Sequence, residues 1–325
     1  GPIVTGLTIT AGYTGTLCDD GGCGSGRQRL QVRGAGTPVS IASGTNPIEV
    51  QKFHYMPNAA TLTTVAGANY NGKITGSTNY ASLELMANMA VNDANFSLGG
   101  NVTAQSFLIW RAQSSGASIF NVTVDTNGKD ITTSNNFSVG SAGTTNNHAT
   151  LKNTSATVST IDVGANLQID SASGTSGTSQ INSDNINFLV AGNWKNYDTF
   201  NFTAGNSCAV TFDGTADQTI TTNAKAFNNL TLNNTGASGS DDIIISNTLD
   251  VDGTLTITDG DLDIGTNNPA VNTAGNVSIG ASGSVSKGTG TWTFDGSGTS
   301  SWTDSTSSGQ DLGAVTIDGT SKTIN

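Results

Sequence analysis

The sequence predicts an all-β fold, an elongated right-handed parallel β-helix (β-solenoid), and three observations lead to this prediction. Only 11% of the 325 residues are charged, and Gly, Ser, Thr and Asn dominate the remaining polar positions. Short alternating runs such as "LTL", "LDV" and "VTI" recur along the chain, each followed by Asn or Asp. Longer stretches also resemble one another at a nearly fixed offset, which indicates an array of repeats.

The alternating runs are interpreted as strands because Thr, Val and Ile fit a pleated surface, whereas Gly, Asn and Asp fit bends. Runs of three to five residues are too short to form stable hairpins alone. Strand, bend and strand in frequent succession is typical of coils stacked on one another, and the usual handedness of parallel crossovers makes them right-handed. At roughly 22 residues per coil, the chain would form about 15 coils and a rod on the order of 70 Å long.

The longer similarity is clearest between residues 191–235 and 274–320. Both contain "AGN", at 191 and 274, and "TFDG", at 211 and 293, followed by "FNNLTLNNT" from 227 and "LGAVTIDGT" from 312. A fainter parallel relates the stretch from 149 to that from 230. We therefore expect a solenoid over 57–325 with a super-repeat of about 83 residues, best developed in 149–325, preceded by a solenoid start or cap in 1–56.

The first 56 residues contain two features of their own. Cys18 and Cys23 enclose "CDDGGC", and with only two His in the chain a disulfide formed in an oxidising compartment is favoured over a zinc site. "RQRLQVRG" places Arg27, Arg29 and Arg33 on one side of a strand. These arginines either protect an exposed edge strand or form a docking strip for the acidic C-terminal half of a second copy. The third cysteine, Cys208, is predicted to be a small buried residue.

The acidic stretch "LDVDGTLTITDGDLDIG" begins at residue 249. Its apolar residues alternate with polar ones, so its carboxylates are predicted to face outward. An EF-hand loop is excluded, because counting from Asp259 places Ile264 at the required Gly and Ala270 at the required Glu. Two interpretations stay open: solvated faces, or a Ca²⁺ site in which one pair of carboxylates stands beside a second pair on the next coil. The candidate metal ligands are Asp250, Asp252, Asp261 and Asp263.

Nine Asn-x-Ser/Thr triplets are candidate glycosylation sites, although such triplets arise by chance in a chain this rich in Asn, Ser and Thr. They begin at Asn95, Asn101, Asn121, Asn136, Asn153, Asn201, Asn229, Asn233 and Asn276.

The net charge of −12 argues against nucleic acid as a partner, since a phosphate backbone requires clustered cations. No apolar run reaches the roughly 18 residues of a membrane-spanning helix. Residues 1–25 also lack the order of a signal peptide, so any export signal is expected to have been removed or to lie outside this chain.

The stretches "AGNW", "TFDGTADQTI", "FNNLTLNNTG" and "LDVDGTLTITDGDLDIG" resemble the repeats of large bacterial surface adhesins, in particular filamentous-haemagglutinin-like β-helical proteins. The resemblance covers residues 140–325 well and the first 140 residues weakly. It implies an extracellular or cell-surface location and a role as adhesin, stalk, surface layer or filament. No active site accompanies it.

Two other classes of function are the alternatives. A polysaccharide lyase or hydrolase is disfavoured because His54 and His148 lie far apart and Arg111 beside Trp110 is typical of packing. A carbohydrate-binding surface module would use exposed aromatic residues. The cluster "NWKNYDTFNF" is the best candidate, but Phe200 and Phe202 share a face, which indicates interior packing.

The sequence thus predicts a non-catalytic, secreted structural or adhesive protein. Its copies would stack end to end into a rod, filament or lattice, with cell-surface glycans as further candidate partners and Ca²⁺ as the one cofactor considered.

Overall fold

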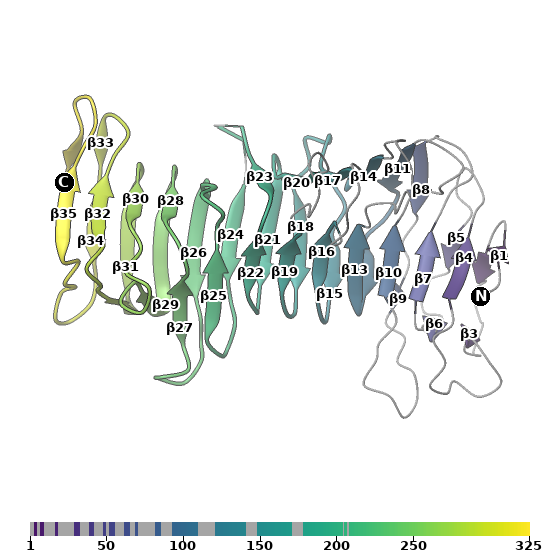
Figure 1. Ribbon diagram of the computed structural model, residues 1–325, viewed down its shortest axis with the longest axis horizontal. Helices are drawn as coiled ribbons and strands as arrows, with labels where there is room; N and C mark the ends of the chain where they lie inside the picture. Colours follow the sequence, from purple (N-terminus) through teal and green to yellow (C-terminus); the bar gives the residue numbers. More distant parts are fainter. Residues whose placement is uncertain are drawn as a thin grey trace.

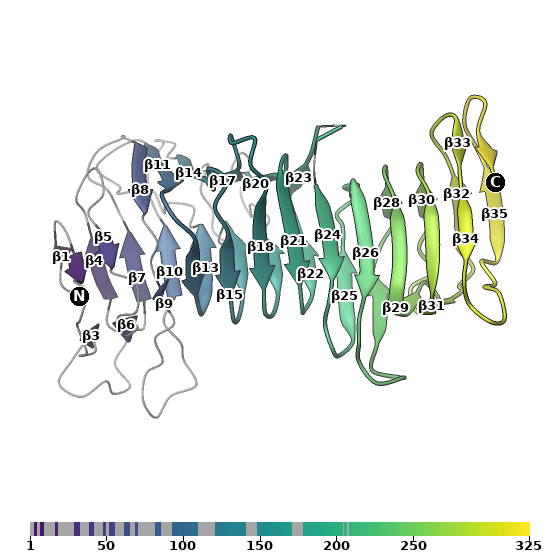
Figure 2. The ribbon, with the colours of Figure 1, turned by 180° about the vertical axis from the view of Figure 1, so that it is seen from behind.

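The chain forms an elongated parallel β-solenoid, with about 8 turns in the part that the structure describes beyond its strands (Figure 1, Figure 2). The computed structural model describes residues 93–109, 121–140, 148–170, 178–203, 205–206 and 208–325, and before residue 93 only the strands themselves. Every element in this described part is a β-strand, and neighbouring turns pair in parallel. The predicted all-β solenoid is therefore confirmed.

Each turn contributes one strand to each of three faces, because strands three apart in chain order pair with one another over much of the solenoid. Faces 1 and 2 together form one 20-stranded sheet. Face 1 contains β9 (Asn69–Tyr70), β12 (Val102–Ala104), β15 (Ile131–Thr133), β18 (Ser159–Val163), β21 (Ile186–Val190), β24 (Ala209–Phe212), β26 (Asn229–Asn233) and β34 (Trp302–Asp304).

Face 2 begins at the N-terminal end of the chain and continues through most of the solenoid. It contains β1 (Ile3–Val4), β4 (Arg29–Val32), β7 (Lys52–Tyr55), β10 (Ser82–Leu85), β13 (Ser106–Ile109), β16 (Phe137–Val139), β19 (Leu167–Ile169), β22 (Trp194–Asn196), β25 (Gln218–Thr221) and β27 (Asp242–Ile245). The strands within residues 1–56 thus pair as later ones do. Because β4, which contains Arg29, pairs with both β1 and β7, it is not the exposed edge strand that the sequence analysis considered, and β7 pairs in turn with β10.

Two long strands cross the corner between faces 1 and 2. They are β29 (Leu255–Asp263) and β31 (Val277–Ser286). The first half of β29 pairs with β26 on face 1, and its second half pairs with β27 on face 2. A register shift between Ile257 and Asp259 marks the corner where the strand β29 changes face.

Face 3 holds a six-stranded sheet followed by a four-stranded one. Phe227 connects them, because its ring lies 5.9 Å from that of Phe200 in the first sheet and its backbone pairs with Val251 in the second. The first sheet is β8 (Leu62–Val65), β11 (Asp93–Leu98), β14 (Asn121–Asp125), β17 (His148–Lys152), β20 (Ser179–Asn182) and β23 (Thr199–Asn201). The second is β28 (Leu249–Val251), β30 (Val271–Thr273), β32 (Thr291–Phe294) and β35 (Ala314–Ile317).

Three short pairs complete the described strands. They are β2 (Leu7–Ile9) with β5 (Val39–Ile41), β3 (Leu17–Cys18) with β6 (Ile48–Glu49), and β33 (Thr299–Ser300) with β36 (Thr323–Ile324).

The turns are longer and fewer than the sequence analysis expected. The expected 22 residues per coil is too short for many turns in the described part, because loops lengthen them, so the estimate of about 15 coils was too high. Asn187 contacts Ala209 on the next turn 22 residues later, but Asn136 contacts Asn166 on its next turn 30 residues later.

The core is a single narrow column of side chains inside the three faces. In most of the strands whose side chains are described, alternate residues are buried, as in β14, where Val122 and Val124 face inward while Asn121, Thr123 and Asp125 lie at the surface. The largest buried side chains are Trp194, Trp292, Phe96, Phe107, Phe137, Phe188, Phe212 and Phe227. Each fully buried side chain of this size contributes about 1.5–3 kcal/mol relative to exposure, so the interior column is the main source of stability.

Asparagine side chains connect successive turns at one corner. The Oδ1 atom of Asn136 accepts the N–H of Asn166, the Oδ1 of Asn166 accepts the N–H of Asn193, and the Oδ1 of Asn193 accepts the N–H of Thr219. The distances are 3.1, 2.9 and 2.7 Å. This amide ladder pairs backbone N–H groups that a bend would otherwise leave without partners, which explains why Asn is so frequent in the sequence.

A buried glutamine organises the corner after the first "TFDG". Gln218 has no exposed surface, and its Nε2 atom donates to the carbonyls of Val190 (2.8 Å) and Gly192 (2.7 Å). Its Oε1 atom accepts the N–H of Gly214 (3.2 Å) and the side-chain amide of Asn234 (3.3 Å). One side chain therefore ties together three consecutive turns.

The 83-residue similarity does not correspond to a whole number of turns. In the first copy, "AGN" at 191 follows β21 and "TFDG" at 211 overlaps the end of β24, both on face 1. In the second copy, "AGN" at 274 follows β30 and "TFDG" at 293 overlaps the end of β32, both on face 3. What repeats is a strand with its following corner, and the same strand-and-corner unit has been used on different faces.

Candidate functional site

The four aspartates proposed as metal ligands lie on two different faces. Asp250 is on β28 of face 3, opposite Asn272, and Asp252 follows it at the next corner. Asp261 and Asp263 are on the face 2 half of β29. The expected juxtaposition of the two pairs is absent, because the chain turns two corners between Val251 and Asp261 and so places the pairs on separate sheets.

Asp263 also corrects the expectation that all these carboxylates face outward. It is only 8% exposed, and its Oδ1 atom accepts the N–H groups of Gly265 (2.8 Å) and Thr266 (2.9 Å). The carboxylate therefore closes the bend at the end of β29, a common use of Asp in turns. The predicted alternation holds over 249–257, where Leu249, Val251, Leu255 and Ile257 are all buried.

A different set of aspartates stands together, on consecutive turns of face 2. Asp242 pairs in register with Asp261, and the N–H of Asp242 donates to the Oδ1 of Asp217 on the preceding turn (3.2 Å). On the following turn Ser284 pairs with Asp261, and its hydroxyl donates to the Oδ1 of Asp261 (2.9 Å). We call Asp217, Asp242 and Asp261 the aspartate ladder. Its members lie about one rung spacing apart, or ~4.8 Å along the axis.

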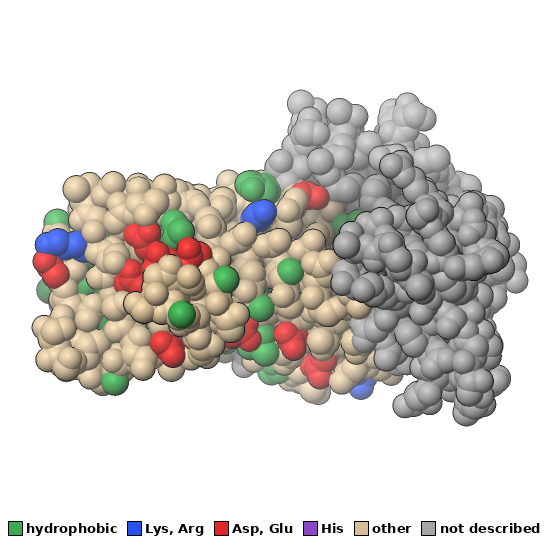
Figure 3. Space-filling model, turned by 90° about the horizontal axis from the view of Figure 1, so that it is seen from below, with side chains coloured by type: hydrophobic (Ala, Val, Ile, Leu, Met, Phe, Trp, Pro, Cys, Tyr) green, Lys and Arg blue, Asp and Glu red, His purple; other side chains and the backbone are tan. Residues whose placement is uncertain are grey.

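The surface around the aspartate ladder is negatively charged. Burial raises the pKa of Asp242, and the nearby carboxylates of Asp217, Asp261, Asp263 and Asp241 raise it further. Acidic side chains gather on the surface seen in Figure 3, in the C-terminal half of the rod. Like charges at this spacing repel one another, so the ladder costs stability at neutral pH unless cations screen it.

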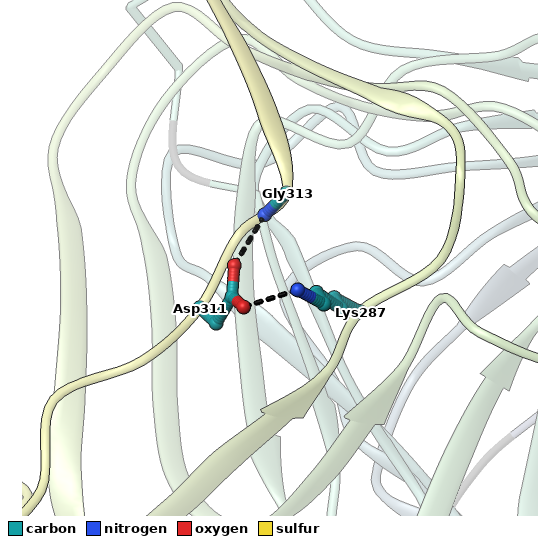
Figure 4. A network of polar contacts seen from close by, with 3 residues as sticks. All are labelled: Lys287, Asp311 and Gly313. Atoms are coloured by element: carbon teal, nitrogen blue, oxygen red, sulfur yellow. Dashed lines mark hydrogen bonds and ion pairs between the residues drawn. The ribbon is translucent and has the colours of Figure 1, made fainter.

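The only ion pair among the described residues is elsewhere. Figure 4 shows it: the ammonium of Lys287 contacts Asp311, whose Oδ1 atom also accepts the N–H of Gly313 (3.0 Å). The pairing lowers the pKa of Asp311, first through the hydrogen bond from Lys287.

The carboxylate oxygens of the aspartate ladder are the kind of ligand that suits a hard cation. Its carboxylates stand in line, and within the described residues no group of three or more acidic, His or Cys side chains forms a metal cage.

A second acidic group lies on face 3. Burial raises the pKa of Asp250, with Asp252 and Asp295 as further causes, and burial followed by Asp295 raises the pKa of Asp252. Asp295 is the aspartate of the second "TFDG", and its Oδ1 atom is buried without a hydrogen-bond partner. Two distinct acidic surfaces therefore replace the single site expected from the sequence.

The C-terminal end of the solenoid differs from face to face. On face 2 the side chain of Gln310 accepts the N–H of Val285 (2.8 Å), in place of a further strand. Asp304 holds this loop by accepting the N–H groups of Thr306 and Gln310, both at 2.9 Å. On face 3, β35 pairs with β32 along one edge, and its Val315 and Ile317 are 49% and 58% exposed.

The aromatic cluster around Trp194 is interior, as predicted. Trp194 and Phe200 are buried, Phe202 is partly buried against the core, and only Tyr197 is exposed, at 46%.

Cys208 is buried, as expected, and its Sγ atom lies 3.0 Å from the hydroxyl of Ser183. Burial raises the pKa of the Cys208 thiol to about 11. It is therefore protonated at neutral pH and unsuited to act as a nucleophile.

Several predicted residues lie outside the described residues or have undescribed side chains. They are the proposed disulfide of Cys18 with Cys23, the arginines Arg27, Arg29 and Arg33, and the pair Trp110 and Arg111, together with His54. The other histidine has a structural contact: the Nδ1 atom of His148 lies 2.6 Å from the hydroxyl of Thr178 on the next turn.

The candidate glycosylation sites divide according to their hydrogen bonds. Asn153 is 8% exposed, and its Oδ1 accepts two N–H groups while its Nδ2 donates to the carbonyls of Thr157 and Asn185. A glycan on Nδ2 would break these bonds. Asn101, Asn136, Asn229 and Asn276 each accept a backbone N–H from the next turn. Asn201 on β23 is exposed, and Asn95, Asn121 and Asn233 are half-buried.

Comparisons with protein-family models, curated proteins and solved structures gave no match. Within the residues that the structure describes, no helix is long and apolar enough to cross a membrane.

Proposed function

We propose that this protein is a non-catalytic, secreted structural or adhesive component of a cell surface, whose solenoids stack end to end into a rod, filament or lattice. The observation that supports this most is the exposed final strand of face 3. Val315 and Ile317 continue the rows of Trp292 and Phe294, with which they pair, yet both are largely exposed.

A further parallel turn is the natural complement to β35, whether a second copy or a continuation of the same chain supplies it. One edge of β35 is paired with β32 and the strand carries two exposed β-branched residues, which together form a template for strand addition. A second copy would cover the apolar side chains and pair the backbone groups of the free edge. The three arginines at 27, 29 and 33 supply a basic counterpart to the acidic C-terminal half, which would favour head-to-tail order.

Stacking is tested by placing charge on this end. The double variant Val315→Lys, Ile317→Lys is expected to fold, because both side chains are exposed, but to remain monomeric, because buried ammonium groups would oppose the joint. Sedimentation velocity over a range of concentrations measures the change. Val158→Lys, at another exposed apolar residue, is the matched control and should associate like the wild type.

Two outcomes would contradict the proposal. A wild-type chain that stays monomeric at every concentration would remove the stacking role. Discrete monomers that depolymerise an acidic polysaccharide would favour the enzymatic alternative, and monomers that bind cell-surface glycans without cleaving them would favour a carbohydrate-binding module.

Cation stiffening is a second proposed property, and the aspartate ladder supports it. Ca²⁺ would relieve the repulsion among Asp217, Asp242 and Asp261, so it should raise the melting temperature more than NaCl of equal ionic strength does. A shift on the order of a few degrees is expected if binding adds about 1 kcal/mol. Thermal unfolding followed by circular dichroism measures it.

The control for cation stiffening compares two neutralised aspartates. Asp242→Asn removes the centre of the ladder and should abolish most of the calcium-specific shift, whereas Asp318→Asn, at an exposed residue after β35, should leave it intact. Equal shifts with Ca²⁺ and NaCl, or equal loss in both variants, would show that the ladder binds no cation specifically.

A further inference from the structure

Asp213, the aspartate of the first "TFDG", occupies an unusual position for a charged group. It follows β24 directly, and its N–H donates to the carbonyl of Val190 on the preceding turn (3.2 Å). Its Oδ1 atom is buried and has no hydrogen-bond partner. An ionised carboxylate oxygen in such a place loses its hydration without gaining a donor, which is costly.

The charged groups around Asp213 are other carboxylates. From β18, two turns earlier, Asp162 acts on it electrostatically. The adjacent strands β21 and β26 carry no charged residue, and neither does β24 itself. The corner that follows contributes Asp217, whose Oδ1 is occupied by the N–H of Asp242. The one ion pair of the described part lies between Lys287 and Asp311, so it does not compensate Asp213.

We infer that Asp213 is a proton-binding residue whose own contribution to the stability of the solenoid is greater in mildly acidic surroundings than at neutral pH. Protonation would remove the partly buried negative charge and its repulsion with Asp162, and the neutral carboxyl group fits this corner with less desolvation cost. The inference does not depend on end-to-end stacking, since it concerns the interior of one chain.

The direction of the pH effect follows from the pKa of Asp213. Burial raises that pKa, Asp162 raises it further, and the residue's own N–H opposes these effects in part. The folded state therefore holds the proton more tightly than the unfolded chain, whose Asp pKa is about 3.9. The stabilisation is fully present below about pH 3.9 and is lost as the pH rises through the raised folded value.

Other groups oppose this effect, so the test must isolate Asp213. Hydrogen bonds from the hydroxyl and N–H of Thr306 lower the pKa of Asp304, and acid therefore weakens the loop at the C-terminal end. The useful quantity is the ratio between the unfolding equilibrium constants of the wild type and of Asp213→Asn, measured in urea at about pH 7 and about pH 4.5.

The amide of Asp213→Asn mimics the neutral carboxyl group. The variant is expected to be more stable than the wild type at neutral pH, with the difference shrinking in acid by up to about tenfold per pKa unit of the folded-state rise. Asp318→Asn, which neutralises an exposed aspartate, should show a ratio that does not change in this manner.

Carbon-detected NMR titration of the Asp213 carboxyl group in the wild-type protein provides a second measurement, which is informative even if the variant fails to fold. A midpoint clearly above 3.9 supports the inference. A midpoint at or below that value, or a stability ratio independent of pH, would overturn it.

Discussion

Replacing Trp194 with alanine is expected to destabilise the solenoid by about 3–5 kcal/mol, because it leaves a large cavity in the interior column. Trp194 is 1% exposed, and its ring contacts Phe188, Phe200, Phe212 and Phe227 at centroid distances of 5.8, 5.0, 6.4 and 5.4 Å. Phe188 and Phe212 lie on face 1, and Phe200 and Phe227 lie on face 3, so the ring of Trp194 on face 2 bridges all three faces. Urea unfolding followed by tryptophan-independent circular dichroism measures the loss.

Tyr197 provides the matched control for this prediction. It lies three positions after Trp194 and is 46% exposed, so Tyr197→Ala should change the free energy of unfolding by about 0.5 kcal/mol or less. Similar losses in both variants would indicate that the aromatic cluster does not pack as described. Because each turn contacts mainly its neighbours, we also expect that in the Trp194→Ala variant the turns around residue 194 lose hydrogen-exchange protection before the C-terminal turns do.

Replacing Gln218 with leucine is expected to cost roughly 3 kcal/mol or more, although leucine has a similar size and greater hydrophobicity. The change deprives the carbonyl of Gly192 and the N–H of Gly214 of the Gln218 side-chain hydrogen bonds. Both groups lie in a buried corner. Among the described residues, no other side chain bonds to the Gly192 carbonyl or to the Gly214 N–H. The free energy of unfolding from urea titration, together with the melting temperature, measures the effect.

The control for Gln218 is a glutamine on the outer surface. Gln168 on β19 bonds the carboxylate of Asp170 and is only half-buried, so Gln168→Leu should cost far less. If both substitutions proved nearly neutral, the polar corner would not contribute to stability and the interior apolar column alone would hold the turns together.

The fold class could be predicted because its main determinant is local. A strand buried on one side alternates apolar and polar residues, and the chain shows this at Leu249, Val251, Leu255 and Ile257 in both sequence and structure. Gly260, with φ of 87°, shows why a bend followed "TITD": the left-handed region disfavours side chains with a Cβ atom, and a Cβ there would lie 2.8 Å from the carbonyl of Asp241.

The number of turns and the face of each strand could not be predicted in the same way. Alternation tells which side of a strand is buried, but loop length decides how many residues close a turn. The two "TFDG" motifs illustrate this, since the same four residues end a strand on face 1 and another on face 3. A sequence offset of 83 residues reports similar strand-and-corner units and does not fix their position around the axis.

The acidic site was partly accessible from the sequence. Asp261 was identified as a candidate, but its neighbours along the axis, Asp217 and Asp242, lie 25 residues apart on successive turns and carry no shared local motif. Aligning "DQTIT", "DIII" and "DLDI" as successive rungs would have shown the ladder, because each run begins with one of its three aspartates.

Backbone ladders run lengthwise through the chain, and we propose that they continue from one chain into the next. Electron microscopy of the purified protein over a range of concentrations tests this most directly, through the distribution of particle lengths. We predict unbranched rods one solenoid wide whose length grows with concentration in multiples of one subunit. Particles of a single subunit length at every concentration, or aggregates joined side by side, would contradict it.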